Sequence, residues 1–543
     1  MFEDIDARMT KDTLNGYNRM MQRTLIATML MLLICTAGAA YFNYGFFHPD
    51  EYFQIIEFAS NKLGITEAKD LPWEYSERVR PWLQPAICYV LIKGMVAVGI
   101  ENRFVMTFVL RLIFGLIGCA AVGATTKLAM RWASNKSQCT FQALVIPILC
   151  YFPLLLTRTS SESFSLSLFT LAVALLMWRG MPAQRDGCKV GINNAIFVGM
   201  LLGLAFEIRY QTAALTLGLI AWMLSISRTR LWTILAVIAG MVLPIVASVF
   251  IDNWGYGEAT FPFFNYFMHN MVMNKAAHYG TSPFYAYLYL VMVNPAPIFG
   301  LLLLLSMFLF WYRQPRHVWT WVTMPFFVIH SIISHKEDRF LLPMLVIMTA
   351  MLVPALDPSE GKPIALLKKM IRIQHRWVFW SLYSLNGIFL LLLSFYPFTV
   401  DSHFFLQRYI YENNNAGFEY YKTDFDPYIR WGLNYSFYKP DGLIAKKVST
   451  VSEIERMPEL SGSKAYFISG LPYIEGSSDE LAHRTKRIVT DCALICFNKE
   501  IEEKLHPLLK ALRDLSPENI VWGSIFEISP KEDPRGVPLS PSK

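Results

Sequence analysis

Long apolar blocks, rather than amphipathic stripes, dominate the chain up to about residue 397. Residues 24–43 carry no charge over a length that suits a membrane-crossing helix. Further blocks of this kind lie at approximately 104–124, 139–156, 163–178, 193–208, 211–226, 231–251, 286–311, 317–333, 340–356 and 377–397. The pattern predicts an all-α polytopic membrane protein, a bundle of about 11 transmembrane helices.

The run 83–100 is ambiguous, because it is long enough to span but contains Lys93. If it spans, the basic loop at 127–136 falls on the outside. If it lies along the interface, all the basic loops fall on one side, which the positive-inside rule assigns to the cytoplasm. We therefore predict an interfacial helix over 83–100. The outer loops are then 44–103, 158–162, the neighbourhood of Arg209, 252–285 and 335–339.

From residue 398 onward the chain changes to an ordinary soluble composition. The runs 464–470, 493–497 and 524–528 predict strands, and the spacing of apolar residues over 500–515 predicts an amphipathic helix. We predict a small α/β domain over 398–543, on the extracytoplasmic (lumenal or periplasmic) side, after a membrane domain over 1–397. The residues from Ser529 onward are expected to form a loose tail.

Composition supports the membrane assignment, since 54% of the 543 residues are hydrophobic and only 17% are charged. The net charge of +7 does not indicate a nucleic-acid partner, because the basic residues lie mainly in short loops between apolar blocks. The eight cysteines have neither metal-ligand spacing nor the pattern of a disulfide framework. We therefore expect no metal site.

Two adjacent carboxylates, Asp50 and Glu51, stand just beyond the first apolar block, after His48 and Pro49. A single acid at such a place is more often a solvated loop residue, at odds of roughly two to one. Two acids among aromatic side chains at a membrane boundary are costly unless a proton must be moved there. The pair is therefore a candidate reaction centre.

The same predicted face carries a second charged cluster, in the sequence His335-Lys336-Glu337-Asp338-Arg339-Phe340. One reading is a solvated turn with weak local ion pairs. The other is an anion site, in which the lysine and arginine, with the histidine, bind a phosphate. An acid pair that faces such a cluster would suit displacement of a phosphate leaving group by a hydroxyl.

These two motifs resemble those of glycosyltransferase family 22, the α-mannosyltransferases that use dolichyl-phosphate mannose and have the GT-C fold. His335, Lys336, Glu337, Arg339 and Phe340 match the late motif H-K-E-x-R-F, and Asp50, Glu51 and Gln54 match the first-loop motif. Further matches are Asp252, Tyr256-Gly257, Phe264-Asn265-Tyr266 and Tyr279-Gly280. The resemblance covers roughly residues 24–356. It is greatest to the glycosylphosphatidylinositol mannosyltransferases, especially those that add the third mannose.

The resemblance implies an inverting enzyme that moves mannose from a polyprenyl (dolichyl) phosphate mannose donor to a glycolipid acceptor, without metal or cofactor. Asp50 would be the base and Glu51 its partner. His335, Lys336 and Arg339 would bind the donor phosphate, with supporting roles for Glu337, His48, Gln54, Arg80 and Arg209. The enzyme would be a multi-pass protein among membrane lipids, in the endoplasmic reticulum if eukaryotic or the inner membrane if bacterial, with its site on the extracytoplasmic face.

Three alternatives stay open at this point. The acceptor could be a lipid-linked oligosaccharide or a bacterial envelope glycan instead of a glycosylphosphatidylinositol precursor. The protein could be a lipid or solute transporter, although such proteins tend to carry ionisable residues near the bilayer midplane and pseudo-repeated halves. It could also be a non-catalytic subunit of a membrane complex.

Overall fold

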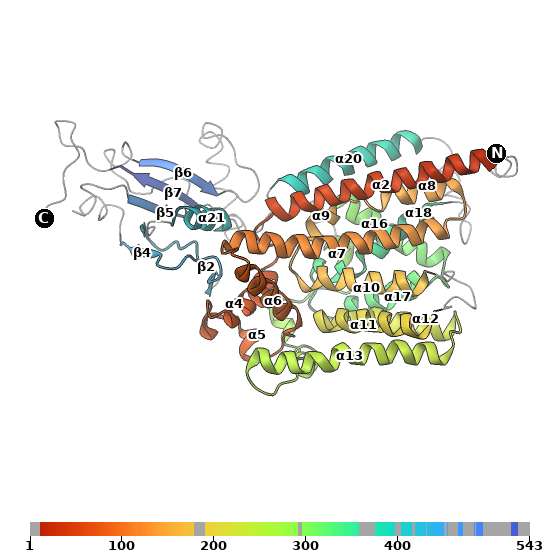
Figure 1. Ribbon diagram of the computed structural model, residues 1–543, viewed down its shortest axis with the longest axis horizontal. Helices are drawn as coiled ribbons and strands as arrows, with labels where there is room; N and C mark the ends of the chain where they lie inside the picture. Colours follow the sequence, from red (N-terminus) through yellow and green to blue (C-terminus); the bar gives the residue numbers. More distant parts are fainter. Residues whose placement is uncertain are drawn as a thin grey trace. The chain divides into compact units, whose positions relative to one another are not determined.

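The computed structural model describes residues 11–178, 190–290, 296–357, 375–396, 403–414, 419–430, 432–449, 453, 465–470, 483, 485–491 and 523–529. The chain divides into two compact units. Unit 1 consists of residues 1–42, 73–90 and 108–397, and unit 2 of residues 43–72, 91–107 and 398–543. Unit 1 is a helical bundle, and unit 2 contains a β-sheet (Figure 1).

The predicted apolar blocks form the helices of the bundle. They are α2 (Lys11–Phe42), α7 (Arg103–Trp132), α8 (Lys136–Val145), α9 (Tyr151–Leu156), α10 (Ser161–Met177), α11 (Ile192–Ile208), α12 (Ala213–Ser225), α13 (Leu231–Tyr256), α16 (Pro297–Arg313), α17 (Val318–Ile332), α18 (Leu345–Leu356) and α20 (His375–Phe395). Within the described ranges, five helical runs are long and apolar enough to cross a membrane, and α10, α11, α16 and α17 are shorter apolar helices. The predicted helical membrane bundle with a small C-terminal sheet is confirmed, while the count of about 11 spans stays a prediction.

Two predicted spans differ from the structure. The block 139–156 is not one helix, because α8 ends at Val145 and α9 begins at Tyr151. The break is stabilised by Asn386 of α20, which accepts a hydrogen bond from the amide of Cys150 (2.9 Å) and donates one to the carbonyl of Ile148 (2.7 Å). Non-helical backbone is tolerated at membrane depth when such a side chain satisfies it. The block 286–311 begins with a separate short helix, α15 (Tyr287–Leu290), before α16.

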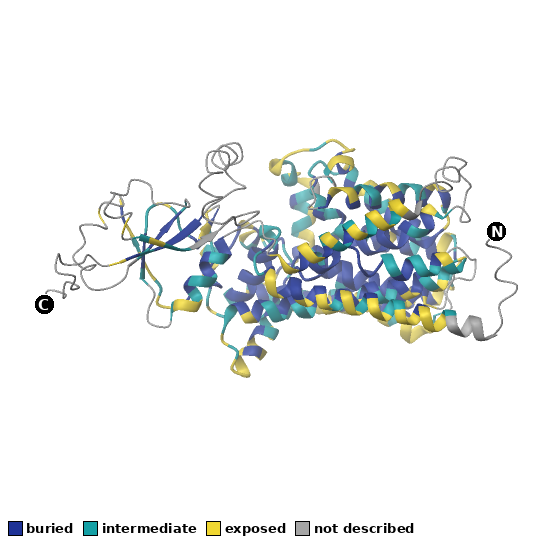
Figure 2. Cartoon of the chain, turned by 90° about the horizontal axis from the view of Figure 1, so that it is seen from above, coloured by how far each residue is buried: buried dark blue, intermediate teal, exposed yellow. Residues whose placement is uncertain are grey.

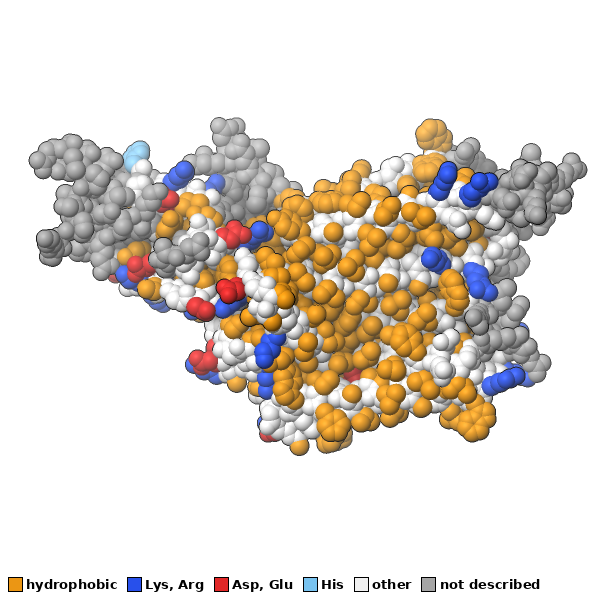
Figure 3. Space-filling view, viewed as in Figure 1, with side chains coloured by type: hydrophobic (Ala, Val, Ile, Leu, Met, Phe, Trp, Pro, Cys, Tyr) orange, Lys and Arg blue, Asp and Glu red, His pale blue; other side chains and the backbone are white. Residues whose placement is uncertain are grey.

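Residues on the inner sides of the helices are mostly buried (Figure 2). On the face that Figure 3 shows, hydrophobic side chains cover the bundle almost continuously, and lysine and arginine side chains gather near its ends. This distribution is typical of a bundle whose middle band faces lipid. α6 (Leu83–Ala97) coincides with the ambiguous run 83–100, and its placement along the interface stays a prediction.

Helices α11 and α13 approach each other closely through glycines. A Cβ at Gly199 would lie 2.1 Å from the carbonyl oxygen of Val237, and one at Gly240 would lie 2.1 Å from that of Ile196. Small residues at such positions let the two backbones pack directly, which is a common way of holding membrane helices together.

Replacing Gly240 by alanine is therefore expected to destabilise the bundle by roughly 1–3 kcal/mol, because the new methyl group must push the two helices apart. The measurement is thermal unfolding of the purified protein in detergent. Gly387→Ala in α20 is the matched control, since nothing lies within 4 Å of a Cβ there. An equal loss in both variants would contradict the close-packing interpretation.

Unit 2 combines the first loop region with the C-terminal part of the chain. Its sheet has the order β4-β1-β5-β7-β6, formed by β1 (Glu419–Lys422), β4 (Ile444–Lys447), β5 (Ala465–Ser469), β6 (Thr485–Asp491) and β7 (Gly523–Ile528). β4, β1 and β5 are parallel, and β7 is antiparallel to both β5 and β6. The short strands β2 (Ile429–Arg430) and β3 (Leu433–Asn434) pair separately.

The predicted strands at 464–470 and 524–528 correspond to β5 and β7. The predicted strand at 493–497 and the helix at 500–515 lie outside the described residues. The division at 397/398 was drawn along the sequence, whereas the compact units also group residues 43–72 and 91–107 with the C-terminal part. The acid pair therefore belongs to the same unit as the sheet.

Candidate active site

The predicted acid pair lies in a tight turn of unit 2, which we call the acid loop (residues 46–53). The turn contains the short helix α3 (Pro49–Glu51), with proline at its first position. His48 caps this helix, since its Nδ1 accepts a hydrogen bond from the amide of Asp50 (3.2 Å). A π-helical turn, η1 (Tyr52–Ile56), follows at once. Such irregular turns occur frequently at functional sites.

The two acids of the loop have different surroundings. Glu51 is buried, and its Oε1 accepts hydrogen bonds from the amides of Phe47 and His48. It therefore completes the cap of α3 and holds the turn together. The carboxylate of Asp50 is 23% exposed, and its Oδ1 lies 3.6 Å from Nδ1 of His48. Of the two acids, Asp50 is the more exposed and so the better placed to contact a substrate. Gln54, the third residue of the first-loop motif, is buried in η1.

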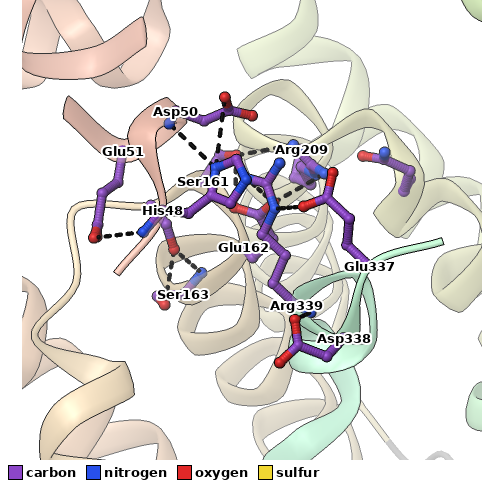
Figure 4. Close-up of polar contacts among 12 residues, drawn as sticks. His48, Asp50, Glu51, Ser161, Glu162, Ser163, Arg209, Glu337, Asp338 and Arg339 are labelled. Carbon is purple, nitrogen blue, oxygen red and sulfur yellow. Dashed lines mark hydrogen bonds and ion pairs between the residues drawn. The ribbon is translucent and has the colours of Figure 1, made fainter. Parts of the chain in front are cut away.

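Unit 1 holds a buried arginine cluster, which consists of Glu162, Arg209, Glu337 and Arg339 (Figure 4). Glu162 Oε1 lies 2.9 Å from Nη2 of Arg209 and 3.3 Å from Nη1 of Arg339. Arg339 Nε donates to Oε2 of Glu337 (2.5 Å), and Arg209 Nη1 donates to the hydroxyl of Ser161 (3.3 Å). The cluster thus joins the start of α10, the end of α11 and the start of η6 (Asp338–Met344).

Three side chains of the arginine cluster are almost fully buried, with 1% exposure for Glu162, 6% for Arg209 and 7% for Arg339, while Glu337 is 25% exposed. The ring of Phe340 lies 5.5 Å from the guanidinium carbon of Arg209 and 5.4 Å from that of Arg339. One carboxylate and one ring therefore orient two guanidinium groups together. Planar guanidinium groups held in this way suit bidentate binding of a phosphate.

His335 and Lys336 contact backbone carbonyls and Glu337, and their predicted phosphate role stays a prediction. His335 Nδ1 lies 3.1 Å from the carbonyl oxygen of Gly280, and its Nε2 lies 2.9 Å from Oε1 of Glu337. Lys336 Nζ donates to the carbonyls of Ser282 (3.0 Å) and Ile333 (2.5 Å). Both side chains thus fasten the segment 274–283, and we call this pair of residues the latch.

The charge states of the latch follow from these contacts. The hydrogen bond to Glu337 raises the pKa of His335, while desolvation lowers the pKa of Lys336. Because the folded-state pKa of His335 is raised, the stability that it contributes is present at low pH and lost as the pH rises through that pKa. Binding of an anion by the latch would require at least one of these hydrogen bonds to be exchanged.

Replacing Lys336 by methionine is expected to loosen the segment 274–283, because the charge-assisted hydrogen bond from Lys336 to the carbonyl of Ser282 is lost. Amide hydrogen exchange of that segment should accelerate by about 10-fold or more. Lys275→Met, in the same segment, is the control. A large rise in the KM of the donor with unchanged exchange would instead identify Lys336 as a phosphate ligand.

Arg80 lies in another part of unit 1, 3.7 Å from Oε1 of Glu74 and 5.9 Å from the ring centre of Tyr266. The motif residues of 252–266 hold the backbone around it. Asp252 Oδ1 accepts from the amide of Trp82 (2.7 Å), Tyr256 donates to the carbonyl of Arg80 (2.7 Å), and Asn265 donates to that of Arg78 (3.1 Å). These matching motif residues therefore fix the loop before α6.

The structure brings Arg209, Glu337 and Arg339 together within unit 1, with His335 and Lys336 adjacent in the latch. Asp50, Glu51, His48 and Gln54 lie in unit 2. Convergence of the acid loop with the arginine cluster stays a prediction. Sequence analysis missed Glu162, although its position after Ser160 and Ser161 at a helix start, on the predicted outer face, was a usable signal.

Residues 27–426 match the model of the Alg9-like mannosyltransferase family. The chain belongs to this family. The match includes the acid loop and the latch motif, and it confirms the predicted relationship to glycosyltransferase family 22. It ends before the last strands of the sheet.

Among relatives of this family member, a GPI mannosyltransferase 3 from Yarrowia lipolytica is 28% identical over 350 residues, which cover 63% of this chain and 62% of the relative. A GPI alpha-1,2-mannosyltransferase 3 from Danio rerio is 23% identical, over 55% of this chain and 53% of the relative. The chain thus spans less than two thirds of the length of these curated relatives.

A probable Dol-P-Man:Man(7)GlcNAc(2)-PP-Dol alpha-1,6-mannosyltransferase from Schizosaccharomyces pombe is 32% identical over 169 residues, which cover 30% of each chain. Among solved structures, ArnT from Cupriavidus metallidurans bound to undecaprenyl phosphate has a TM-score of 0.48 at 12% identity. That similarity covers 82% of this family member and 92% of ArnT.

Proposed function

We propose that this protein is an inverting α-mannosyltransferase that uses a polyprenyl-phosphate mannose donor and a glycolipid acceptor, such as a glycosylphosphatidylinositol precursor. The observation that carries the proposal is the arginine cluster, in which two buried guanidinium groups share Glu162 within the family's own motif region. Buried, pre-oriented guanidinium groups are suited to stabilise charge on a departing phosphate. The names of the relatives support the donor and the acceptor class.

In the proposed reaction, a hydroxyl of the acceptor attacks the anomeric carbon of the β-linked mannosyl phosphate from the opposite side. Asp50 accepts the proton of this hydroxyl as the new carbon–oxygen bond forms. The bond between the anomeric carbon and the phosphate oxygen breaks, and both of its electrons leave with the polyprenyl phosphate. Arg209 and Arg339 stabilise the charge that develops on this leaving group. The product is an α-mannoside, a polyprenyl phosphate and a proton.

Glu51, in this proposal, supports catalysis by holding the turn that presents Asp50. Its carboxylate already accepts hydrogen bonds from the amides of Phe47 and His48. The latch residues His335 and Lys336 hold the segment 274–283 next to the arginine cluster. Gln54, buried in η1, and Arg80, beside Glu74, would support the structure around the site without contacting the reacting atoms.

The proposed membrane orientation places the arginine cluster on the extracytoplasmic side, which is the lumenal side in an endoplasmic reticulum membrane. In this orientation α2 ends and α10 begins on the extracytoplasmic side. Arg131, in the last turn of α7, and Arg228 and Arg316, in the α12–α13 and α16–α17 connections, then lie on the opposite side. A surplus of arginine and lysine marks the cytoplasmic side of membrane proteins. Glycolipid acceptors with extracytoplasmic headgroups would then meet the site directly.

A second acceptor class is favoured by one observation. The relative from Schizosaccharomyces pombe, which is named for a lipid-linked oligosaccharide acceptor, has the higher identity over a shorter stretch. An assay with both acceptor classes decides between them. Membership of a mannosyltransferase family disfavours the transporter alternative.

The test is an assay with purified protein, radiolabelled dolichyl-phosphate mannose and a panel of acceptors in mixed lipid–detergent micelles. The panel contains mannosylated glucosaminyl-phosphatidylinositols and a lipid-linked oligosaccharide, and digestion with linkage-specific α-mannosidases identifies the product. We expect transfer to a glycosylphosphatidylinositol precursor. Transfer to the oligosaccharide alone would select the second class, and transfer to no glycolipid by an intact, folded protein would overturn the proposal.

A further inference from the structure

The aromatic side chains of the acid loop are packed against residues from far along the chain. Phe46 and Tyr52 contact the rings of Phe404 and Tyr435, and Phe53 contacts that of Tyr435, with ring centres 5.1–6.2 Å apart. Tyr52 also stacks on Tyr438, with ring centres 5.6 Å apart. All six side chains are buried. The aromatic side chains of the acid loop are therefore buried against residues of the C-terminal part of unit 2.

Polar contacts fix the same C-terminal residues to the helix that follows the acid loop. Glu57 of α4 (Glu57–Lys62) is fully buried, and its Oε1 accepts a hydrogen bond from the amide of Phe437 (3.0 Å). Its Oε2 accepts one from the hydroxyl of Thr66 (2.5 Å). Asn434 donates to Oδ1 of Asp70 (2.8 Å). Residues 434–437 are thus held at two separate points by the first loop region.

A third set of contacts comes from residues 103–107. The ring of Tyr438 stacks on Phe104 with centres 4.3 Å apart, and its hydroxyl donates to Oγ1 of Thr107 (2.8 Å). Arg103 Nη1 donates to the carbonyls of Phe437 (3.1 Å) and Lys439 (2.6 Å). These bonds leave the segment little freedom to move by itself. Any displacement of it is transmitted to the rings of the acid loop.

The segment at residues 434–438 lies outside the stretch that matches the family model. That match ends at residue 426, whereas Phe404 lies within it. Tyr435 and Tyr438 supply aromatic partners to the rings of the acid loop, and the amide of Phe437 bonds to Glu57 of α4.

We propose that Phe404, Tyr435, Phe437 and Tyr438 form a C-terminal clamp that positions the acid loop, so that the C-terminal part is a component of the catalytic apparatus. The clamp residues are positioning residues, because they act on the substrate only through Asp50. The consequence for turnover rests on the proposed function, whereas the ordering of the loop does not. Small displacements of a reacting group lower rates by large factors.

The first test measures the order of the acid loop in the full-length protein purified in detergent. Tyr435→Ala is expected to accelerate amide hydrogen exchange at residues 46–53, in particular at Phe47 and His48, whose amides bond to Glu51. Phe467→Ala is the matched control, since Phe467 is a buried aromatic of β5 in the same part of the chain. Equal acceleration in both variants, or none in Tyr435→Ala, would overturn the clamp.

Turnover provides the second readout. Tyr435→Ala should lower kcat by about 10-fold or more, with the KM for the donor changed by no more than about 2-fold, because orientation and not donor binding is impaired. Tyr435→Phe keeps the ring and should restore kcat. A rise in KM without a fall in kcat would show that the clamp does not act through Asp50.

A second pair of variants keeps the proposal testable if Tyr435→Ala does not fold. Glu57→Ala removes the acceptor of the Phe437 amide and should accelerate exchange in the acid loop, while Glu57→Gln retains an acceptor oxygen and should behave like wild type. Burial raises the pKa of Glu57, so the neutral glutamine should become relatively more favourable as the pH rises. Loop exchange unchanged in Glu57→Ala would contradict the clamp.

The two readouts separate this inference from the proposed function. If the wild-type protein transfers no mannose to any acceptor, the proposed function fails, but the exchange measurements still decide whether the clamp orders the loop. If transfer is observed and Tyr435→Ala retains both kcat and loop protection, the clamp fails while the function stands.

Discussion

Replacing Asp50 by asparagine is expected to lower kcat by about 1000-fold, within the range that general base catalysis contributes. Asparagine keeps the size of the side chain and the amide hydrogen bond to His48, but it cannot accept the proton of an acceptor hydroxyl. The fold and donor binding should be unchanged. The measurement is single-turnover transfer of radiolabelled mannose, together with direct binding of the labelled donor.

Glu51→Gln is the matched control for this result. Glutamine retains an oxygen that can accept the hydrogen bonds of the Phe47 and His48 amides, so kcat should fall by no more than about 10-fold. The comparison also decides between the two acids as base. A greater loss in Glu51→Gln than in Asp50→Asn would reverse the assignment, and near wild-type activity in Asp50→Asn would refute it.

The sequence was most informative where a property is local. An uncharged block of membrane length predicts a helix whatever surrounds it, and most of the predicted blocks coincide with helices. The break between α8 and α9 was not predicted, because its backbone groups are satisfied by Asn386, more than 230 positions away. No residue within 139–156 indicates that Asn386 will satisfy the backbone there.

The same distinction applies to the candidate site. The charged residues of the late motif were recognised from their order in the sequence, but their tasks depend on carbonyl groups of Gly280 and Ser282, which carry no side-chain signal. Glu162 was missed because an acid in the first turn of a helix is usually explained by the helix dipole. Its two arginine partners lie on other elements, and only the fold brings them together.

The association of the acid loop with the C-terminal clamp shows the limit of dividing a chain by composition. Composition changes at residue 398, yet the aromatic partners of Phe46 and Tyr52 lie beyond that position. Composition reports which residues can be buried. It does not report which distant residues bury them.

Removing the carboxylate of Glu162 should have the largest effect on stability, because it leaves two buried guanidinium groups without their shared acid. Loss of one partner of a buried ion pair costs about 3–5 kcal/mol. We expect Glu162→Ala to lower the midpoint of thermal unfolding in detergent strongly. Glu258→Gln is the control, since Glu258 pairs with Arg78 at the surface, with about half of its side chain exposed. That change should cost less than about 1 kcal/mol.

The double variant Glu162→Met/Arg339→Met separates stability from phosphate binding. The double variant leaves one buried guanidinium group, that of Arg209, without Glu162 instead of two, so it should unfold later than Glu162→Ala. It should nevertheless show a donor KM raised by about 10-fold or more and a nearly unchanged acceptor KM, because one phosphate-binding guanidinium is gone. Equal effects on both substrates would show that the arginine cluster serves only the fold, and the leaving group would then have to be stabilised elsewhere.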